Sequence, residues 1–395
     1  MLFDIARLFV AWDESSRVVS LHFLSSDDCS NPSGMHAPHL QWINLCPLTE
    51  SRKYMPGGRL FGDNAPLLRD FSISASRFRT DASWLPNLSS VTFYDCFTLE
   101  DVLVSLQRMP QLSSLTDVDL RGNALNEVAT LNAVAILQRI TPSPDCCLAM
   151  DGPYKRPLPA LDPGKNEEYE KAVEAYLVPF LSLHPPSCVS FFLNADMLHI
   201  IDSHPPDLDH RNFIIMLYTP LLHFSSLIKE LVNSACFSHI VMLDLEISSD
   251  YSFDDPANVA ITATLAAFTN VKTLLASEHT LRLLLKQPSI TSTLFPALFT
   301  LQISYPQSRK PGQEESSEPP HQRFLKLRRA VGRPISVLEL KTGSVPCRAG
   351  NMEYLEEHAG LLVKWSSKRV GITEYVCGSG HPARLRKMDL VAELS

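Results

Sequence analysis

An eleven-residue phrase constrains the possible folds of this chain more than any other feature. It runs Leu115-Thr-Asp-Val118-Asp-Leu120-Arg-Gly-Asn123-Ala-Leu125 and follows the spacing L-x-x-L-x-L-x-x-N-x-L at every apolar position and at the asparagine. A unit of this size cannot bury its apolar edge alone, so it requires similar units stacked on both sides. A stacked array offers an extended binding surface rather than a single catalytic pocket.

The core of this phrase, L-x-x-L-x-L with any apolar residue, recurs along most of the chain. The first matches start at residues 18, 40, 68, 88 and 115, which is a period of 20 to 28 residues. Leucine-rich repeats have a period of about 20–29 residues. Weaker matches are Leu148/Met150 and Ile215/Leu217. The strong matches are Val18/Leu21/Phe23, Leu40/Ile43/Leu45, Leu68/Phe71/Ile73, Leu88/Val91/Phe93, Leu115/Val118/Leu120, Cys188/Phe191/Leu193, Ile240/Leu243/Leu245, Val271/Leu274/Ala276, Leu298/Leu301/Ile303 and Ile335/Leu338/Leu340.

Segments between these matches have the patterns of capped helices. Thr98 can cap a helix with the apolar stripe Leu99, Val102, Leu103 and Leu106. Asn166 can cap a second, with Glu167, Glu168 and Glu170 in its first turn and the stripe Val173, Tyr176, Leu177 and Phe180. Asp255-Pro256 begins a third, because proline suits the first helical position. Asn351 caps a last helix that contains Tyr354 and Leu355.

This alternation predicts an α/β fold, an irregular leucine-rich-repeat solenoid over residues 1–395 with parallel strands on its concave face and helices on its convex face. The alternative, a doubly wound parallel sheet, requires a glycine-rich phosphate loop after an early strand. The sequence contains no such loop. Residues 306–322 lack any aliphatic or aromatic side chain and are expected to form a disordered loop within the array, as are residues 25–39.

The composition, 45% hydrophobic and 20% charged over 395 residues, is that of a globular protein with a substantial core. No apolar run reaches the ~18–20 residues of a membrane helix, and the first residues do not resemble a secretion signal. The nine cysteines are irregularly spaced and odd in number, which predicts a reducing compartment, cytoplasmic or nuclear. A net charge of −8 argues against a general nucleic-acid footprint.

Three clusters of side chains could form chemical sites. Their residues are His199, Asp202, His204, Asp207, Asp209 and His210; Cys377 and His381; and the basic run Arg323, Lys326, Arg328, Arg329 and Arg333. The first could hold a divalent metal in a hydrolase, but its spacing matches no ligand pattern and we expect a polar loop. The second is expected to be a turn, and the third a solvated helix face paired with the acidic loop before it. We therefore expect no enzymatic activity, no catalytic residue, no cofactor and no metal.

The candidate partner-binding residues are those that flank the fourth and sixth template positions, because alternate strand side chains face opposite ways. A register error of one residue would turn them inward. They are His22, Trp42, Asn44, Tyr94, Asp117, Asp119, Arg121, Phe192, Asp244, Glu246, Gln302 and Glu339.

Four further phrases carry a family resemblance. They are Leu60-Phe-Gly-Asp-Asn-Ala-Pro-Leu-Leu-Arg-Asp-Phe-Ser-Ile73, Gly332-Arg-Pro-Ile-Ser-Val-Leu-Glu-Leu340, Tyr354-Leu-Glu-Glu-His-Ala-Gly-Leu-Leu-Val-Lys-Trp365 and Glu374-Tyr-Val-Cys-Gly378. These phrases resemble the leucine-rich-repeat region of F-box proteins of mushroom-forming fungi. In that family an N-terminal F-box binds a Skp-type adaptor of a cullin ubiquitin ligase, and the repeats present a substrate. The usual F-box opening is missing ahead of Val18.

We accordingly expect a non-enzymatic protein that recognises another protein through its repeat array, with no nucleic acid or membrane as partner. The resemblance implies that the bound protein is a ubiquitylation substrate. One alternative is a full substrate receptor of a cullin ligase with an atypical or truncated F-box. A third, from another class, is a metal-dependent hydrolase that uses the His199–His210 cluster.

Overall fold

The computed structural model describes residues 8–12, 19–23, 41–45, 65–73, 79–93, 99–116, 127–140, 147–149, 163–193, 197–202, 214–218, 225–234, 236–248, 259–305, 318–342, 347–349, 351–367, 371–386 and 388–390. The chain divides into two compact units. Unit 1 comprises residues 1–183 and 212–216, and unit 2 comprises residues 184–211 and 217–395. In both units, strands of a mostly parallel sheet alternate with helices, so the chain is a mixed α/β protein, as expected.

In unit 1, parallel strands lie side by side in chain order. They are β3 (Trp42–Leu45), β4 (Asp70–Ile73), β5 (Ser90–Thr92), β6 (Ser114–Thr116) and β7 (Cys147–Ala149). The beginning of β10 (Ile214–Tyr218) pairs in parallel with β7. The helices are the 3-10 helix η3 (Leu85–Asn87), α1 (Leu99–Leu106), α2 (Glu127–Ile140) and α3 (Pro163–Leu183).

In the described part of unit 2, six parallel strands lie side by side. In spatial order they are β8 (Cys188–Leu193), β11 (Met242–Ile247), β12 (Thr273–Ser277), β13 (Thr300–Tyr305), β14 (Val337–Thr342) and β16 (Leu362–Ser367). Two strands depart from this direction, because β9 (Met197–Asp202) is antiparallel to β8 and β17 (Gly371–Val376) is antiparallel to β16. A separate antiparallel pair joins β15 (Cys347–Ala349) and β18 (Met388–Leu390).

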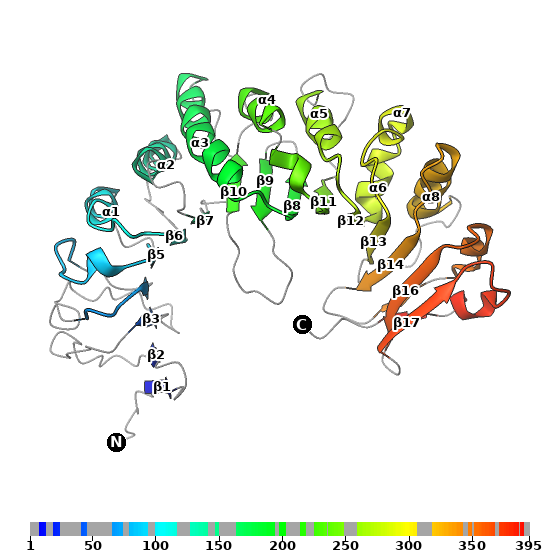
Figure 1. The fold of residues 1–395 in the computed structure, drawn as a ribbon, viewed down its shortest axis with the longest axis horizontal. Coiled ribbons are helices and arrows are strands. Elements are labelled where there is room, and N and C mark those ends of the chain that lie inside the picture. The colour runs from blue at the N-terminus through cyan, green and yellow to red at the C-terminus, as the bar shows by residue number, and fades with distance from the viewer. Residues whose placement is uncertain are drawn as a thin grey trace. The chain divides into compact units, whose positions relative to one another are not determined.

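The helices of unit 2 follow its strands along the chain. They are α4 (Ser225–Asn233), η5 (Cys236–His239), α5 (Val259–Ala267), α6 (Glu278–Leu284), α7 (Pro288–Thr291), α8 (Pro320–Ala330), η7 (Glu353–Glu357) and η8 (Pro382–Leu385). Helices α4 to α8 all lie on the same side of the parallel strands (Figure 1). The other face of the sheet in unit 2 therefore carries no described helix.

The core of unit 2 lies between the strands and these helices. Leu243, Leu274, Leu301 and Leu338 occupy aligned positions on four neighbouring strands, and each is fully buried. All four are the fourth position of the template, so the predicted repeat register is confirmed for these strands. The side chains before and after each leucine point the other way, as the period of two in a strand requires.

The register was wrong for two other matches. Leu115 was placed at the first template position, but it lies opposite Val91, which occupies the fourth, so the strand is shifted by three residues. Phe191 lies opposite Leu245 instead of Leu243, a shift of two. In the observed registers the first template position is occupied by Leu112 in one strand and by Pro186 in the other. Both are buried and lie three residues before Leu115 and Val189, so an apolar residue fills this position at either offset.

The first match was also wrong as a parallel repeat strand. Residues Val19–Phe23 form β2, which pairs antiparallel with β1 (Leu8–Trp12), with Leu21 opposite Val10. Of the weaker matches, Leu148 lies in β7, Ile215 and Leu217 lie in β10, and these two strands are parallel neighbours, whereas Met150 lies outside the described residues. Strand β16 was missed, although Val363 and Trp365 in it are buried at the positions that continue the leucine rows.

The predicted helices exist, with different boundaries. Helix α1 begins at Leu99 as expected, with Val102 and Leu106 buried. Helix α3 begins at Pro163, three residues before Asn166, so Glu167 and Glu168 lie beyond its first turn. Its predicted stripe is buried, and Tyr176 stacks on Phe180 at 5.7 Å. The Asn351 side chain accepts a hydrogen bond from the Glu353 amide at 3.0 Å, but the element that follows is the short 3-10 helix η7.

The prediction of a disordered insert over residues 306–322 is wrong for its last residues. Residues 306–317 lie outside the described part of the chain, but Pro320, His321 and Gln322 form the first turn of α8 and are buried. They are ordered because their polar groups find partners on neighbouring elements. His321 contacts Tyr354, and Gln322 donates to Glu357 at 2.8 Å. The second expected loop, residues 25–39, lies outside the described residues.

The basic run in α8 was predicted to be a solvated face, and this is wrong for Arg328. Its side chain is fully buried and donates to the backbone oxygens of Leu294 at 2.9 Å and Phe295 at 3.1 Å. Phe295 has a φ of 49°, a left-handed conformation that few side chains adopt. Arg328 thus stabilises a strained turn, and burial lowers its pKa. Lys326 does pair with Glu318, at 2.6 Å, as the predicted acidic neighbour implied.

We expect Arg328→Ala to lower the free energy of unfolding by about 2–4 kcal/mol, because two buried carbonyls lose their donor and a cavity remains. Arg323→Ala is the control, since Arg323 is an exposed arginine on the same helix, and we expect a change within about 0.5 kcal/mol. Urea denaturation followed by circular dichroism measures both. Equal stability of the two variants would contradict the role of Arg328.

Candidate functional site

The residues gathered on the helix-free face of unit 2 form the candidate site. We define this face by the side chains of β8, β11, β12, β13, β14 and β16 that point away from the helices. Strand alternation places every second residue there, between buried neighbours such as Leu301 and Ile303. Because the strands are parallel and in register, these residues form rows that cross the sheet.

The central row carries most of the polar groups. Its members lie opposite one another on successive strands and are Ser190, Asp244, Leu275, Gln302, Glu339 and Lys364, followed by Glu374 on β17. A neighbouring row, nearer the carboxyl ends of the parallel strands, contains Phe192, Glu246, Ser277, Ser304 and Lys341. Phe192 is half-buried and Glu246 is exposed.

Hydrogen bonds and ion pairs link neighbours within the central row. Gln302 Nε2 donates to Glu339 Oε2 at 2.6 Å, and the Ser190 hydroxyl donates to Asp244 Oδ2 at 3.3 Å. Lys364 Nζ lies 2.8 Å from Glu374 Oε1, and this pairing raises the pKa of the lysine. The row is therefore fixed at both ends by contacts between strands.

Asp244 is the electrostatically unusual member of this face. Burial raises its pKa, which outweighs the opposing hydrogen bond from Ser190, and the charge of Glu246 raises it further. Lys341 acts in the opposite direction. Asp244 thus carries a carboxyl group whose charge is only partly compensated within the protein, so a cation placed near it would be attracted.

The structure brings together five of the predicted binding residues: Phe192, Asp244, Glu246, Gln302 and Glu339 all lie on this face. Phe192 lies on the predicted face despite the two-residue register shift in β8, because a shift of two residues does not change which side of the sheet a side chain faces. Sequence reasoning missed Leu275 and Lys364 as members of the row. The signals were present, since Leu275 lies between the template positions Leu274 and Ala276, and Lys364 lies between Val363 and Trp365.

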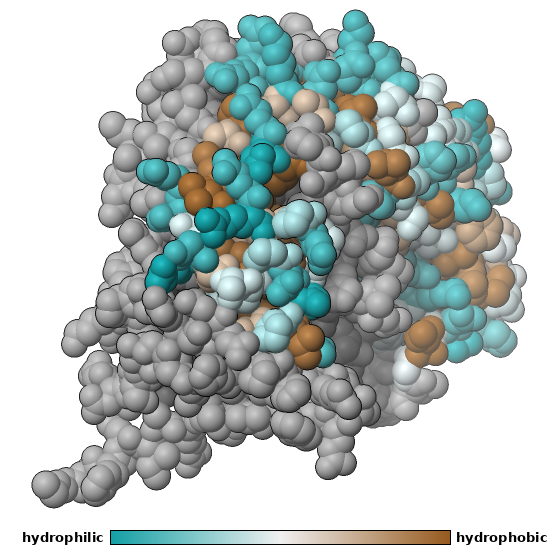
Figure 2. All heavy atoms as spheres, turned by 60° about the vertical axis from the view of Figure 1, so that its left-hand side comes forward, coloured by the Kyte–Doolittle hydropathy of each residue, from teal (hydrophilic) through white to brown (hydrophobic). Residues whose placement is uncertain are grey.

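The remaining predicted residues are in unit 1. Trp42 and Asn44 are on β3 and His22 is on β2, a strand of the antiparallel pair. Tyr94, Asp117, Asp119 and Arg121 lie outside the described residues. Figure 2 turns this side of the molecule forward, and its described residues show hydrophilic and hydrophobic side chains interspersed.

The other chemical candidates resolve differently from expectation. His199 and Asp202 belong to strand β9, with Asp202 buried, so the predicted polar loop is wrong for these two residues. The other members of that cluster, His204 to His210, lie outside the described residues. Over the part of the chain that is described, no group of three His, Cys, Asp or Glu side chains could hold a metal ion. Cys377 is buried, its pKa raised to about 12, and residues 377–380 form the expected turn.

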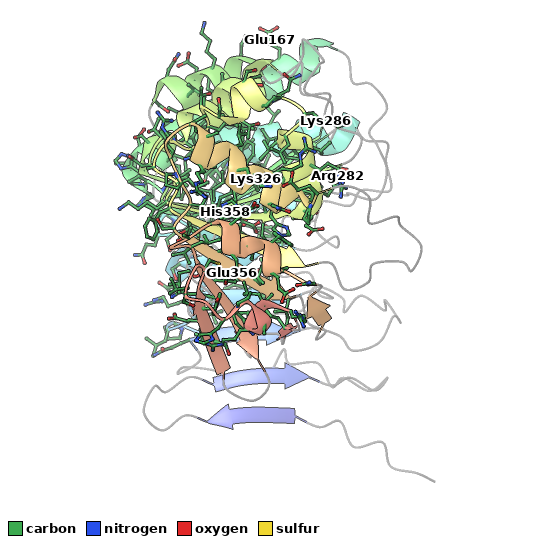
Figure 3. All side chains as sticks on the ribbon, turned by 90° about the vertical axis from the view of Figure 1, so that its right-hand side faces the viewer. Glu167, Arg282, Lys286, Lys326, Glu356 and His358 are labelled. Carbon is green, nitrogen blue, oxygen red and sulfur yellow. The ribbon has the colours of Figure 1, made fainter. Side chains whose placement is uncertain are left out.

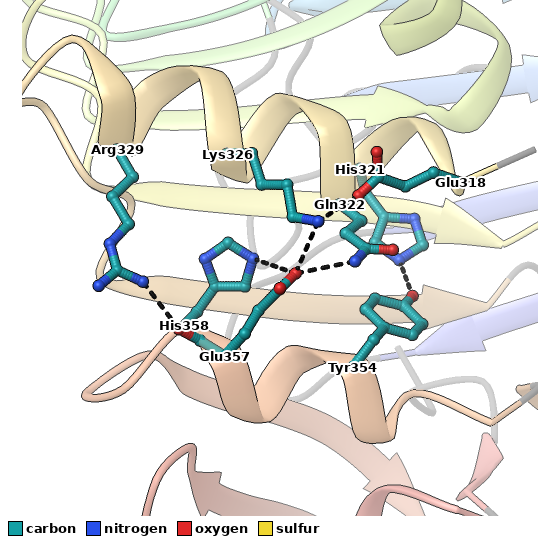
Figure 4. Close-up of polar contacts among 8 residues, drawn as sticks. All are labelled: Glu318, His321, Gln322, Lys326, Arg329, Tyr354, Glu357 and His358. Atoms are coloured by element: carbon teal, nitrogen blue, oxygen red, sulfur yellow. Dashed lines mark hydrogen bonds and ion pairs between the residues drawn. The ribbon is translucent and has the colours of Figure 1, made fainter.

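A second polar cluster lies on the helix side; Figure 4 shows its contacts between α8 and η7, and Glu278 joins it from α6. His321 contacts the Tyr354 hydroxyl through Nε2, while its Nδ1 lies 3.3 Å from Glu278 Oε1. Glu357 accepts from Gln322 and lies 3.1 Å from Lys326 Nζ. Lys326 and His358 lie near each other in Figure 3 as well. Each contact connects different elements of the helix side, which indicates that the cluster holds these elements together.

His358 and His279 are held toward their neutral forms. Burial lowers the pKa of His358, and the charges of Arg329 and Lys326 add to this, against the opposing effect of Glu357. Burial also lowers the pKa of His279, helped by Arg282 and Lys286, which lie close together in Figure 3. For both histidines, burial is the largest cause of the lowered pKa.

No protein-family model matches this chain, and no curated protein is similar to it. Over the described residues, no helix has the length and apolar character needed to cross a membrane.

We expect the stability of the wild type relative to Asp244→Asn to fall as pH rises from about 4 to 7. A raised pKa in the folded state means that folding favours the protonated carboxyl, so its contribution is present at low pH and is lost as the group ionises. Asparagine mimics the protonated form throughout. Urea unfolding of both proteins at several pH values measures the difference.

Glu230→Gln supplies the control for this pH series, because Glu230 is exposed on α4. Its difference from the wild type, measured at the same pH values, is the reference against which the Asp244→Asn difference is compared. A flat difference for Asp244→Asn would show that burial does not raise the pKa of Asp244.

Proposed function

We propose that this chain is a non-enzymatic recognition protein, built as a leucine-rich-repeat array, that binds a segment of another protein on the helix-free face of unit 2. The observation that carries the proposal is the register of β11, β12, β13 and β14. It aligns four buried leucines on one face and the row Asp244, Leu275, Gln302 and Glu339 on the other. A row that crosses several strands suits an extended ligand.

The side chains of this face have the chemistry of an interface. Phe192 supplies an aromatic group, Leu275 an apolar floor, and Gln302, Asp244 and Glu339 supply polar groups. Large aromatic anchors within a polar surround are typical of binding hot spots. The resemblance to F-box proteins adds the proposal that the bound protein is a substrate selected for ubiquitylation.

The test is affinity capture from the protein's native cells, with bound proteins quantified by mass spectrometry and their contact sites located by chemical cross-linking. We expect Phe192→Ala combined with Gln302→Ala to reduce the recovery of a specific partner at least tenfold, which corresponds to about 1.4 kcal/mol. Cross-links are expected to map to residues on β8 to β14.

The matched control places the same kind of truncation on the helix side. Lys229→Ala on α4 and Arg323→Ala on α8 remove exposed side chains, and we expect recovery to stay within about twofold of the wild type. Melting temperatures of all variants verify folding. A partner that is retained by the face variant, or lost equally with the control, would refute this proposal.

A further inference from the structure

Gln302 has an unsatisfied acceptor on the helix-free face. Its side chain is only 8% exposed, and it lies on the central row between Leu275 and Glu339. Its Nε2 donates to Glu339 Oε2 at 2.6 Å, whereas its Oε1 is buried and has no hydrogen-bond partner. A buried acceptor without a donor costs about 1–3 kcal/mol, and most buried polar groups in proteins have a partner, so this oxygen is an exception that needs a reason.

The orientation of this amide is fixed by Glu339. Reversing it would direct the amide oxygen at a carboxylate oxygen, which is repulsive, whereas the observed orientation forms a charge-assisted hydrogen bond. The free oxygen of Gln302 is therefore an acceptor held in place by its neighbour. Only a group with an N–H or O–H donor can complete it.

The charges around Gln302 favour a donor that is also a cation. Asp244, Glu246 and Glu339 are on the same face, and the pKa of Asp244 is already raised by burial and by Glu246. Of the two lysines on the rows, Lys364 is paired with Glu374 at 2.8 Å. The three acidic groups on β11 and β14 therefore outnumber the other lysine of the rows, Lys341. The whole chain carries a net charge of −8.

We propose that the helix-free face of unit 2 binds an extended, arginine-containing segment of the partner protein, with guanidinium groups donating to the carboxylates of Asp244 and Glu339 and, as the buried Gln302 side chain turns outward, to Gln302 Oε1. This inference rests on the proposed function and specifies its partner chemistry. Arginine fits better than lysine, because its planar guanidinium presents five donors and can bond an amide oxygen and a carboxylate together. The apolar stem of the arginine would lie over Leu275.

The row also sets the spacing of the ligand. Asp244 and Glu339 are three strands apart, and neighbouring strands are about 4.8 Å apart, which gives about 14 Å. An extended chain rises about 3.3 Å per residue, so about four residues span this distance. Two arginines separated by three residues therefore match the two carboxylates.

The direct test measures the affinity of the whole chain for a synthetic peptide, fluorescein-Gly-Arg-Thr-Ser-Thr-Arg-Gly-amide, by fluorescence anisotropy at physiological salt. Two control peptides replace both arginines with lysine or with glutamine. We expect the arginine peptide to bind at least threefold more tightly than the lysine peptide, and the glutamine peptide to show no saturable binding.

Protein variants locate the site. Asp244→Asn and Gln302→Leu are each expected to raise the Kd of the arginine peptide at least fivefold. Glu230→Gln, which makes the same charge change on exposed α4 as Asp244→Asn does on β11, is expected to leave the Kd within about 1.5-fold. Thermal melts confirm that the variants are folded. Equal losses in Asp244→Asn and Glu230→Gln would reveal general charge attraction and overturn the proposal.

The outcome separates this inference from the proposed function. If the arginine and glutamine peptides behave alike while partner capture still depends on Phe192 and Gln302, the arginine chemistry is overturned and the recognition function stands. If partner capture does not depend on the face, the recognition function fails and the inference fails with it.

Discussion

The alignment of buried leucines across parallel strands is the contact on which the rest of unit 2 depends. Leu243, Leu274, Leu301 and Leu338 are fully buried and lie opposite one another on four strands. A register shift of one residue would turn all of them to the opposite face of the sheet. Such a shift is costly because burial of each leucine side chain contributes about 1.5–3 kcal/mol. Since strand side chains alternate, the same contact that fixes the leucines also fixes Asp244, Gln302 and Glu339 on the other face.

Polar contacts between helices complement this apolar layer. The cluster of Glu278, His321 and Tyr354 connects α6, α8 and η7, and Arg328 connects α8 to the turn at Phe295. Apolar packing is non-directional and tolerates sliding of one element past another. Hydrogen bonds between buried polar groups tolerate much less, because an unpaired group is costly. These contacts therefore specify the relative positions of α6, α8, η7 and the turn at Phe295, which apolar packing alone would define less sharply.

The properties of the helix-free face follow from its neighbours rather than from any single residue. Asp244 has a raised pKa because of burial and Glu246, and Gln302 has a fixed, unpartnered oxygen because Glu339 holds the other end of its amide. Such groups are inexpensive to retain if a ligand completes them. A surface of this kind is suited to recognition along a row, which is the basis of the proposed binding of an extended segment with arginine side chains.

The sequence by itself determined which leucines of β11 to β14 are buried and that Asp244, Gln302 and Glu339 share the opposite face, because a strand has a period of two and the leucine template marks its phase. It also predicted the burial of the α3 stripe from helical spacing. The sequence did not determine the register of Leu115 and Phe191, because a permissive apolar template fits at several offsets. The registers are set by pairing with Val91 and Leu245 in the folded protein. The burial of Arg328 and the free oxygen of Gln302 were likewise decided by tertiary structure. The residue type alone does not decide whether a charged or amide side chain is buried. Here the hydrogen-bond partners that decide it are carbonyls and carboxylates more than thirty residues away in the chain.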